Sequence, residues 1–303
     1  GYQPFTTAEI VVKDLRWHEQ TLGVPVQWVP VSSGVQAHSA LADGTMDIAL
    51  LGSSPAAAGV AKGIPLEVIW IHDIIGDNEA LVVRENSGIN KVEDLGGKII
   101  AAPFGSTTHY HLVVALTLAR VGPKQTTVIN LEPRDILAAW EKNEIDAAFI
   151  WMPTLAKIIA RGGKVVLSSR DLAEKGFPTC DLAVIRREFG EQYPDLVVQY
   201  LVNQDRAVKF SRANPKAAAA SVARQLDLPP AEAEKQLEAL IMLTAKEQNE
   251  GKYFGGWHWN FALYTVLKET ADFLKQQNLI QFLPDREAFL KAVNAKFLVE
   301  AAE

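Results

Sequence analysis

Short apolar runs alternate with stretches of helical periodicity through the first two thirds of the chain. Residues 48–51 and 98–102 are short and apolar enough to be buried strands, and the segments after them place apolar residues at helical spacing. Such alternation calls for sheets of mostly parallel strands, covered on both faces by helices. Ligands of these sheets bind beyond the carboxyl ends of the strands. We therefore expect an α/β fold with its functional groups in the turns that follow strands.

One such turn lies within residues 102–122. Ser106 is placed as the N-cap of a helix, Thr107 and Thr108 fill its first turn, and Gly122 follows its end. The free amides and the macrodipole of a helix N-terminus attract anions, and three hydroxyls add donors. The sequence therefore indicates an anion site here, with plain helix capping as the alternative.

A second junction of the same kind follows the predicted strand at residues 46–51. Gly52, Ser53, Ser54 and Pro55 lead into an alanine-rich segment. Proline is favoured at the first helical position, which makes Ser54 the predicted N-cap. Capping is again the alternative to a binding role.

Two segments of the chain have the same short sequence pattern. Residues 79–85 and 181–188 each have an acid, then four apolar residues, then charge. The segment between them is long enough to fold as an inserted lobe. We expect residues 1–82 and 185–303 to form one discontinuous lobe and residues 83–184 a second, with the ligand cleft between them and two connecting strands as the hinge. Glu79 and Asp181 would then stand where these strands leave the cleft, either as ligand groups or as solvated strand ends.

Three other segments complete the predicted architecture. Thr6 and Glu9 have the spacing of a capping box, which would open a helix closed by Gly23. Residues 26–31 are typical of a strand that frays or lies at an edge, because Pro30 lacks an amide hydrogen. From Pro194 onward nearly all the sequence is typical of helices.

Composition excludes several classes of protein. Hydrophobic residues make up 48% and charged residues 22%, which is ordinary for a globular chain. A net charge of -6 argues against nucleic acid as a partner. Cys180 is the single cysteine, which excludes an intramolecular disulfide and a cysteine zinc site. The chain begins at Gly1 without a leader, so a signal peptide or lipid anchor cannot be read from it.

Two histidines lie close together on the predicted helix after Ser106. His109 and His111 are two positions apart and so point to different faces of the helix, and no acidic motif accompanies them. We expect neither a metal nor any other cofactor. His109, at the helix start, could donate to an anion or simply lie beside the cap.

Several motifs, taken in order, resemble one known family. They are Tyr2-Gln3, Leu51-Gly52-Ser53-Ser54-Pro55, Asn78-Glu79-Ala80-Leu81-Val82-Val83, Ser106-Thr107-Thr108-His109-Tyr110, Trp151 with Pro153, and Pro178-Thr179 with Asp181. With further matches along nearly the whole chain, this order is similar to that of the taurine-binding periplasmic proteins of ABC importers, within a wider group for sulfonates, nitrate and thiamine precursors. Two features depart from the family: almost all of the strand before Tyr2 is absent, and the C-terminal third differs.

The resemblance implies a type II periplasmic binding protein of two Rossmann-like lobes joined by two hinge strands. It implies a taurine-like ligand, delivery of that ligand to the permease subunits of an ABC importer in the membrane, and a periplasmic or lipid-anchored location. We expect a monomer.

Taurine is a zwitterion, so a closed site must satisfy a sulfonate and an ammonium group. The predicted sulfonate ligands are the hydroxyls and helix-start amides of Ser53, Ser54, Ser106, Thr107 and Thr108. Glu79 and Asp181 are the predicted ammonium ligands. The predicted pocket walls are Trp151, Tyr110, Tyr2, Gln3 and His109.

Alternative functions remain open at this point. A binding protein for alkanesulfonates, nitrate or another amine-bearing anion would share the hydroxyl turns, but anion-only ligands have no use for the acid pair. An enzyme is disfavoured because the chain has no hydrolase elbow, zinc-protease motif or P-loop. A sensory regulator would carry a helix-turn-helix head. We expect Trp257, His258 and Trp259 to anchor the following helix, with a lid as the alternative.

Overall fold

The computed structural model describes residues 1–250, 253–254 and 262–302. The chain forms two compact units. Unit 1 comprises Gly1–Ile74 and Cys180–Glu303, and unit 2 comprises Ile75–Thr179. One unit is therefore inserted into the other, and the chain crosses between them twice.

The limits of the units lie earlier in the chain than the predicted ones. The expected boundaries, 82/83 and 184/185, fall inside strands β3 (Glu79–Arg84) and β8 (Cys180–Arg186). β3 is paired with unit 2 strands along its length, and β8 is paired with unit 1 strands along its length. A strand belongs with the sheet that satisfies its backbone groups, so each is assigned whole.

The unit 1 sheet has three strands in the order β1-β8-β2. β1 (Ile48–Gly52) and β2 (Leu66–Ile74) are joined by helix α4 (Ser53–Ala61), and β8 returns between them, antiparallel to both. The expectation of mostly parallel pairing is wrong for this sheet. Alternation along the chain predicts the direction of β1 relative to β2, but not the strand that enters between them from the far side of the insertion.

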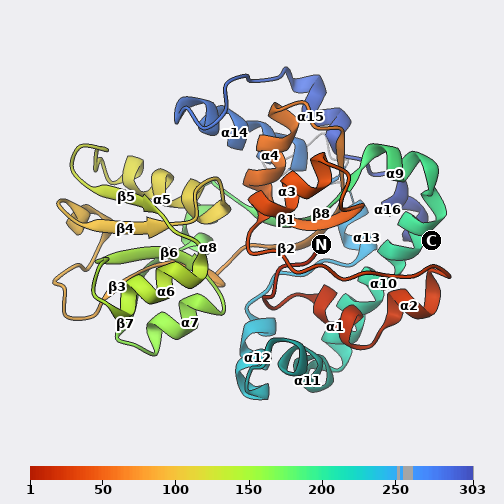
Figure 1. Ribbon diagram of the computed structural model, residues 1–303, viewed down its shortest axis with the longest axis horizontal. Coiled ribbons are helices and arrows are strands. Elements are labelled where there is room, and N and C mark those ends of the chain that lie inside the picture. The colour runs from red at the N-terminus through yellow and green to blue at the C-terminus, as the bar shows by residue number, and fades with distance from the viewer. Residues whose placement is uncertain (251–252, 255–261, 303) are drawn as a thin grey trace. The chain divides into compact units, whose positions relative to one another are not determined.

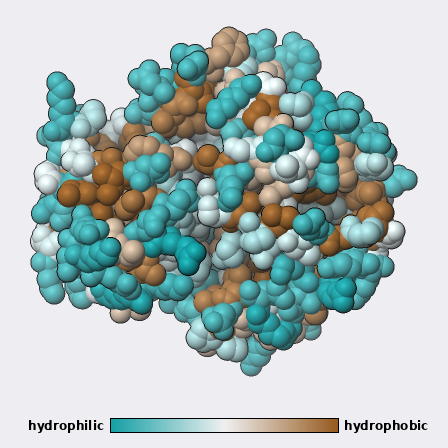
Figure 2. Space-filling model, in the orientation of Figure 1, coloured by the Kyte–Doolittle hydropathy of each residue, from teal (hydrophilic) through white to brown (hydrophobic). Residues whose placement is uncertain are grey.

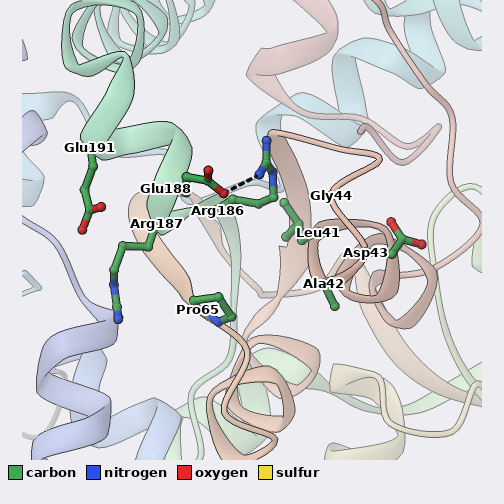
Figure 3. A pocket seen from close by; sticks show the side chains of 9 residues that line it. All are labelled: Leu41, Ala42, Asp43, Gly44, Pro65, Arg186, Arg187, Glu188 and Glu191. Atoms are coloured by element: carbon green, nitrogen blue, oxygen red, sulfur yellow. Dashed lines mark ion pairs between the residues drawn. The ribbon is translucent and has the colours of Figure 1, made fainter.

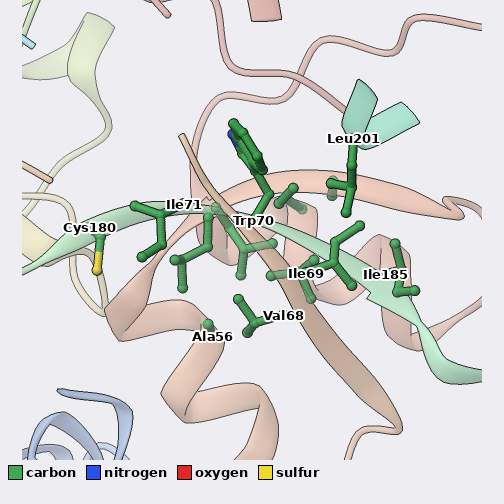
Figure 4. Close-up of a cluster of buried hydrophobic side chains, with 14 of the residues drawn as sticks. Ala56, Val68, Ile69, Trp70, Ile71, Cys180, Ile185 and Leu201 are labelled. Atoms are coloured by element: carbon green, nitrogen blue, oxygen red, sulfur yellow. The ribbon is translucent and has the colours of Figure 1, made fainter. Parts of the chain in front are cut away.

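Helices surround this sheet. The other helices of unit 1 are α1 (Ala8–Asp14), α2 (Trp17–Thr21), α3 (Gly34–Ala42), α9 (Arg187–Gln192), α10 (Pro194–Ala213), α11 (Pro215–Leu226), α12 (Pro230–Glu238), α13 (Ala245–Asn249), α14 (Leu263–Gln276), α15 (Arg286–Ala292) and α16 (Lys296–Ala301). The core lies where they meet the strands: Trp70 of β2 is buried with Ala56 of α4 and Leu201 of α10 (Figure 4).

The first helical segment differs from its prediction. Residues 6–23 form two short helices, α1 and α2, because Arg16 between them has a positive φ of 56°. Thr7 is the N-cap of α1 and its side chain makes no capping bond. Glu9 is buried and accepts a hydrogen bond from the Tyr200 hydroxyl at 2.8 Å, so the predicted capping box is wrong.

Residues 26–31 form no strand, contrary to the prediction. Their one ladder contact is a parallel bridge between Pro30 and Tyr2. The Tyr2 amide donates to the Val29 carbonyl and the Val31 amide donates to the Tyr2 carbonyl. Pro30 has no amide hydrogen to extend this pairing.

The unit 2 sheet has five strands in the order β5-β4-β6-β3-β7. β4 (Ile99–Ala102) is parallel to β5 (Thr127–Asn130) and to β6 (Ala147–Trp151). β3 is antiparallel to β6 and to β7 (Gly163–Ser168). The sheet is therefore mixed, with the expected parallel part at β5, β4 and β6.

Helices cover both faces of the unit 2 sheet (Figure 1). α6 (Pro133–Glu141) and α7 (Thr154–Ile159) pack on the face that carries Ala80 and Val82. α5 (Thr107–Leu118) and α8 (Ser169–Glu174) contact each other, and α5 lies over strands β3, β4 and β6. A short 3₁₀ helix, η1 (Val92–Leu95), precedes β4.

Hydrophilic residues cover most of the face shown in Figure 2, with hydrophobic residues in small groups between them. Within the described ranges, no helix has both the length and the apolar character that a membrane span requires.

Candidate functional site

The start of helix α5 in unit 2 is built as the sequence predicts. Ser106 is the N-cap, and its Oγ accepts a hydrogen bond from the His109 amide at 3.2 Å. The Ser106 hydroxyl donates to the Pro103 carbonyl at 2.6 Å, and Thr108 Oγ1 lies 2.8 Å from Ser106 Oγ. Because the Ser106 hydrogen is already used, Thr108 is the donor in that pair. The amides of Thr107 and Thr108, in the first helical turn, have no acceptor within the helix.

Glu79 lies directly beside this helix start. The Thr107 hydroxyl is 2.6 Å from Glu79 Oε1, and Ser169 Oγ of α8 is 3.3 Å from Glu79 Oε2. Glu79 is only 4% exposed. The structure therefore brings a predicted sulfonate ligand and a predicted ammonium ligand into contact, although they are far apart in the sequence.

The two histidines of α5 have separate environments. His109 stacks on Phe104 with ring centroids 4.3 Å apart, and its Nδ1 accepts from the Gly105 amide at 3.3 Å. Burial lowers its pKa to about 4, so at neutral pH His109 is an uncharged ring. His111 is fully buried and contacts Ser169. Sequence reasoning gave His111 no role beyond a rejected metal pair.

Unit 1 carries the other predicted acid. Asp181 of β8 is 6% exposed, and its register partners are Gly52 at the end of β1 and Asp73 near the end of β2. Burial raises the pKa of Asp181 to about 7. Asp73 is fully buried and was missed in the sequence, although a His-Asp pair that closes an otherwise apolar run is a signal for it. Gly52, Asp181 and Asp73 thus form one row across the sheet.

The Ser-Ser-Pro turn begins at one end of this row. Gly52, not Ser54, is the N-cap of α4, and Ser53 is the first helical residue. Ser53 Oγ accepts from the Cys180 amide at 3.4 Å. Ser54 is fully buried and its Oγ has no hydrogen-bond partner among the described residues. A buried hydroxyl without a partner calls for an explanation, and this makes Ser54 a candidate donor to a ligand.

The predicted pocket walls lie in different places. Trp151 ends β6, is half-buried and is the register partner of Glu79. Tyr110 is buried in α5. Gln3 Nε2 donates to the Leu50 carbonyl of β1 at 3.3 Å, while Tyr2 packs edge-to-face on Trp28. Trp151 therefore lies beside Glu79 in unit 2, Tyr110 lies in the same unit, and Tyr2 and Gln3 lie in unit 1 beside β1.

Two further expectations concern other parts of the chain. Trp257, His258 and Trp259 lie outside the described residues. Among the residues that are described, no three His, Cys, Asp or Glu side chains are grouped to hold a metal ion.

A surface pocket of unit 1 lies at the opposite end of the sheet from Asp181 (Figure 3). Arg186, at the far end of β8, pairs there with Glu188 at 3.5 Å. The pocket is lined by Leu41, Ala42, Asp43, Gly44, Pro65, Arg186, Arg187, Glu188 and Glu191. It contains none of the predicted ligand groups.

The fold defines a class of protein. The structure aligns with the alkanesulfonate-binding protein SsuA from Xanthomonas axonopodis pv. citri bound to MOPS, with a TM-score of 0.79 and 23% identity over 97% of this chain and 96% of that one. This is the two-lobe fold of periplasmic binding proteins. A family profile described as the substrate binding domain of ABC-type glycine betaine transport systems matches residues 1–238. The chain belongs to that family.

Curated relatives agree with this assignment. The chain is 39% identical to the taurine-binding periplasmic protein of Escherichia coli K12 over 193 residues, which are 64% of this chain and 59% of that protein. It is 30% identical to a putative aliphatic sulfonates-binding protein of Bacillus subtilis over 218 residues, 70% of this chain and 64% of that protein. The matches thus span less than two thirds of the length of these two relatives.

Proposed function

We propose that this chain is the substrate-binding component of an ABC importer, that it captures taurine or a close aminosulfonate, and that it delivers the ligand to a membrane permease. The observation that carries this proposal is the pairing of helix-start donors with buried carboxylates: Thr107 with Glu79 in unit 2, and the Ser53-Ser54 turn with Asp181 in unit 1. Both halves of a zwitterionic ligand find a complement in these groups.

The sulfonate end needs donors. The free amides at the starts of α5 and α4 supply them, and the macrodipole of each helix favours the negative charge there. Ser54 adds a buried hydroxyl without a protein acceptor. The hydroxyls of Ser106 and Thr108 are bonded to each other and to Pro103, so in our proposal they hold the turn in shape while the amides bind the sulfonate oxygens.

The ammonium end needs acceptors. Glu79 and Asp181 are both buried carboxyl groups. A buried carboxylate is costly unless it is paired with a cation, and the raised pKa of Asp181 expresses that cost. A ligand ammonium brings a positive charge to these carboxyls, so each favours amine-bearing ligands over plain alkanesulfonates.

A second candidate is a general alkanesulfonate receptor. The likeness to a putative aliphatic sulfonates-binding protein of Bacillus subtilis favours it, and a plain sulfonate needs only donors such as the helix starts of this chain. Glu79 and Asp181 argue against it, since a ligand without an amine brings no positive charge to these buried carboxyls.

The proposed location and partners of the protein follow from the same proposal. A binding component of an importer acts outside the cytoplasm, so we place this chain in the periplasm or at the cell surface, as a monomer that meets the permease subunits. We assign it capture and release of a ligand with no chemical step, as the name of the family implies.

Isothermal titration of the purified protein with taurine, ethanesulfonate, glycine and glycine betaine tests the proposal. We expect micromolar or tighter binding of taurine and much weaker binding of the other three. Equal or stronger binding of ethanesulfonate would establish the second candidate. Preferred binding of glycine betaine would exclude both sulfonate functions. Sulfonate buffers have to be avoided, because they present the same group as the ligand.

A further inference from the structure

The ring of His109 is held at the start of helix α5. Its Nδ1 accepts a hydrogen bond from the Gly105 amide at 3.3 Å, and its backbone amide donates to Ser106 Oγ at 3.2 Å. Gly105 precedes the N-cap Ser106, so the bond to Nδ1 draws the ring toward the N-terminal end of the helix. That end also carries the amides of Thr107 and Thr108, which have no acceptor within the helix. His109 therefore lies in the part of unit 2 to which we assign the sulfonate.

A second contact fixes the plane of the His109 ring. The ring stacks on Phe104, with centroids 4.3 Å apart and an angle of 14° between the ring planes. Phe104 is itself held by its backbone amide, which donates to Asn130 Oδ1 at 2.8 Å. Because the plane and Nδ1 are both fixed, the direction in which Nε2 points is fixed as well.

The position of the hydrogen on the ring follows from the bond to Gly105. A backbone amide only donates, so Nδ1 is the acceptor and carries no hydrogen. An imidazole without a hydrogen on Nδ1 is neutral and carries its single hydrogen on Nε2. Burial acts in the same direction, since it lowers the pKa of His109 to about 4. Nε2 is therefore a neutral N–H group that can only donate.

This N–H group has no acceptor within the part of the chain that the structure describes. The hydrogen bonds of His109 use Nδ1 and the backbone amide. Nε2 is not one of the buried side-chain atoms without a partner, so it keeps contact with solvent, although His109 is only 5% exposed. A ligand oxygen that reaches Nε2 would meet a donor whose direction is already set, which reduces the entropy lost on binding.

Helix capping alone would not call for histidine at this position. The third residue after an N-cap is typically glutamate or glutamine, whose side chain accepts an amide hydrogen, as Nδ1 of His109 does here. Glutamate would also suit the positive end of the helix dipole. A carboxylate, however, repels an anion and has no hydrogen to donate. Imidazole accepts with one nitrogen and donates with the other, so it combines capping with the recognition of an anion.

We propose that His109 is a ligand-binding residue of the sulfonate site, and that its Nε2–H donates to a sulfonate oxygen beside the amides of Thr107 and Thr108. This inference rests on the proposed function and deepens it. A sulfonate has only acceptor oxygens, and all three of these protein groups are donors. In the proposed function the amine is bound by carboxyl groups, so His109 should contribute equally to the binding of taurine and of ethanesulfonate.

Nitrogen-15 NMR of the histidine rings tests this donor directly. Comparison with His109→Phe assigns the signals of His109 among the six histidines of the chain. At pH 7, in a buffer without sulfonate or sulfate, the free protein should carry the ring hydrogen on Nε2 and none on Nδ1. Taurine should shift the Nε2 signal and slow the exchange of its hydrogen. Ethanesulfonate should do the same, and ethylamine, which has no anionic group, should not. The signals of His18, a buried histidine of unit 1, are the internal control.

Titration calorimetry of variants gives the effect on affinity. His109→Phe keeps a ring to stack on Phe104 and removes the donor. It should weaken taurine and ethanesulfonate by the same factor, about tenfold to a hundredfold, because both lose a hydrogen bond to a charged group. His109→Gln can accept from Gly105 and donate to the ligand, so it should restore part of both affinities. Thr117→Ala removes an exposed hydroxyl from the same helix and should change neither. A loss of taurine affinity alone in His109→Phe would overturn the proposal.

The two ligands keep this inference separate from the proposed function. If taurine fails to bind but ethanesulfonate moves the Nε2 signal, the proposed function is wrong and the role of His109 stands. If taurine binds without moving that signal, or if the ring hydrogen is on Nδ1, the inference is wrong and His109 only caps the helix. If neither sulfonate binds, both proposals are wrong. The spectra of the wild type decide among these outcomes even if His109→Phe does not fold.

Discussion

Asp73 and Asp181 lie directly opposite each other on the neighbouring strands β2 and β8. A register shift separates this pair from the pair Ile71–Leu182, and partner residues on neighbouring antiparallel strands lie a few ångströms apart. Both side chains are buried, Asp73 fully and Asp181 to all but 6% of its surface. Unit 1 therefore holds two buried carboxyl groups on neighbouring strands, next to the start of α4.

Asp73→Asn should weaken taurine binding by about tenfold to a hundredfold, because one charge-assisted interaction with the ammonium group is worth roughly 1.5 to 3 kcal/mol. Ethanesulfonate binding should be unchanged or slightly stronger. Titration calorimetry with both ligands checks this, and Asp43→Asn, an exposed acid after α3, is the control. If both ligands weaken equally, Asp73 supports the fold and does not recognise the amine.

Asp181→Asn should make the protein more stable at pH 8 while it weakens taurine binding. Burial raises the folded-state pKa of Asp181 to about 7, above the ordinary value for an aspartate. The folded protein then binds the proton more tightly than the unfolded chain, so stability falls as pH rises from about 4 to 7 and stays low above that. Each pKa unit corresponds to about 1.4 kcal/mol.

The measurement is urea denaturation of wild type and Asp181→Asn at pH 5 and pH 8. The advantage of the variant over wild type should be smaller at pH 5 and should grow by one to a few kcal/mol by pH 8, on the order that the pKa shift implies. A variant that is less stable at both values would show that the carboxyl is needed by the fold itself.

Local features of the structure could be predicted from the sequence because they depend on neighbouring residues. The strand at Glu79–Arg84 has the limits that its apolar run indicates, and Ser106 caps α5 as its spacing predicts. Glu9 shows where local reasoning fails. Its spacing from Thr6 matches a capping box, but Tyr200, far along the chain, receives its carboxylate in the core.

The candidate site divides in the same way. The hydroxyl turns and the two acids could be predicted because each lies next to a predicted strand. The contacts among them could not be predicted in this way. The pairing of Thr107 with Glu79 depends on the order of strands in the unit 2 sheet, and the row from Gly52 to Asp73 depends on β8 entering between β1 and β2. Strand order is set by contacts between distant segments, and hydrophobic periodicity carries no information about these contacts.

Gly34→Ala should disturb the Ser53-Ser54 turn from a distance. A methyl group at Gly34 would lie 2.7 Å from Pro55 Cγ and 3.3 Å from the Gly52 amide nitrogen, so the turn has to shift. We expect a loss of about 1 to 3 kcal/mol in stability from overpacking, together with weaker taurine binding.

Thermal unfolding and titration calorimetry of Gly34→Ala give both numbers. Gly96→Ala is the matched control, since a methyl group there meets nothing within 4 Å and the backbone of Gly96 is in an ordinary region. Unchanged stability and affinity in Gly34→Ala would show that the turn can accommodate the added methyl group. Close packing would then not be what holds Ser53 and Ser54 in place.

Glu9→Gln should raise stability at high pH without touching the candidate site. Glu9 is buried beneath α10, and burial raises its pKa to about 7 against the lowering effects of the Gly1 ammonium group and the Tyr200 hydroxyl. Above pH 7 the folded protein holds a buried carboxylate, and between the unfolded and folded pKa values its stability falls as pH rises.

Glutamine keeps the acceptor oxygen for Tyr200 and removes the charge. In urea denaturation the advantage of the variant over wild type should be small at pH 5 and should grow by one to a few kcal/mol by pH 8, with about 1.4 kcal/mol for each pKa unit. Glu238→Gln, an exposed acid of α12, should change neither value.

Tyr200→Phe should act in the opposite direction, because it leaves Glu9 without its hydrogen bond and costs about 1 to 3 kcal/mol. If Glu9→Gln is destabilised at pH 8, the carboxylate is held by interactions that outweigh the cost of its burial.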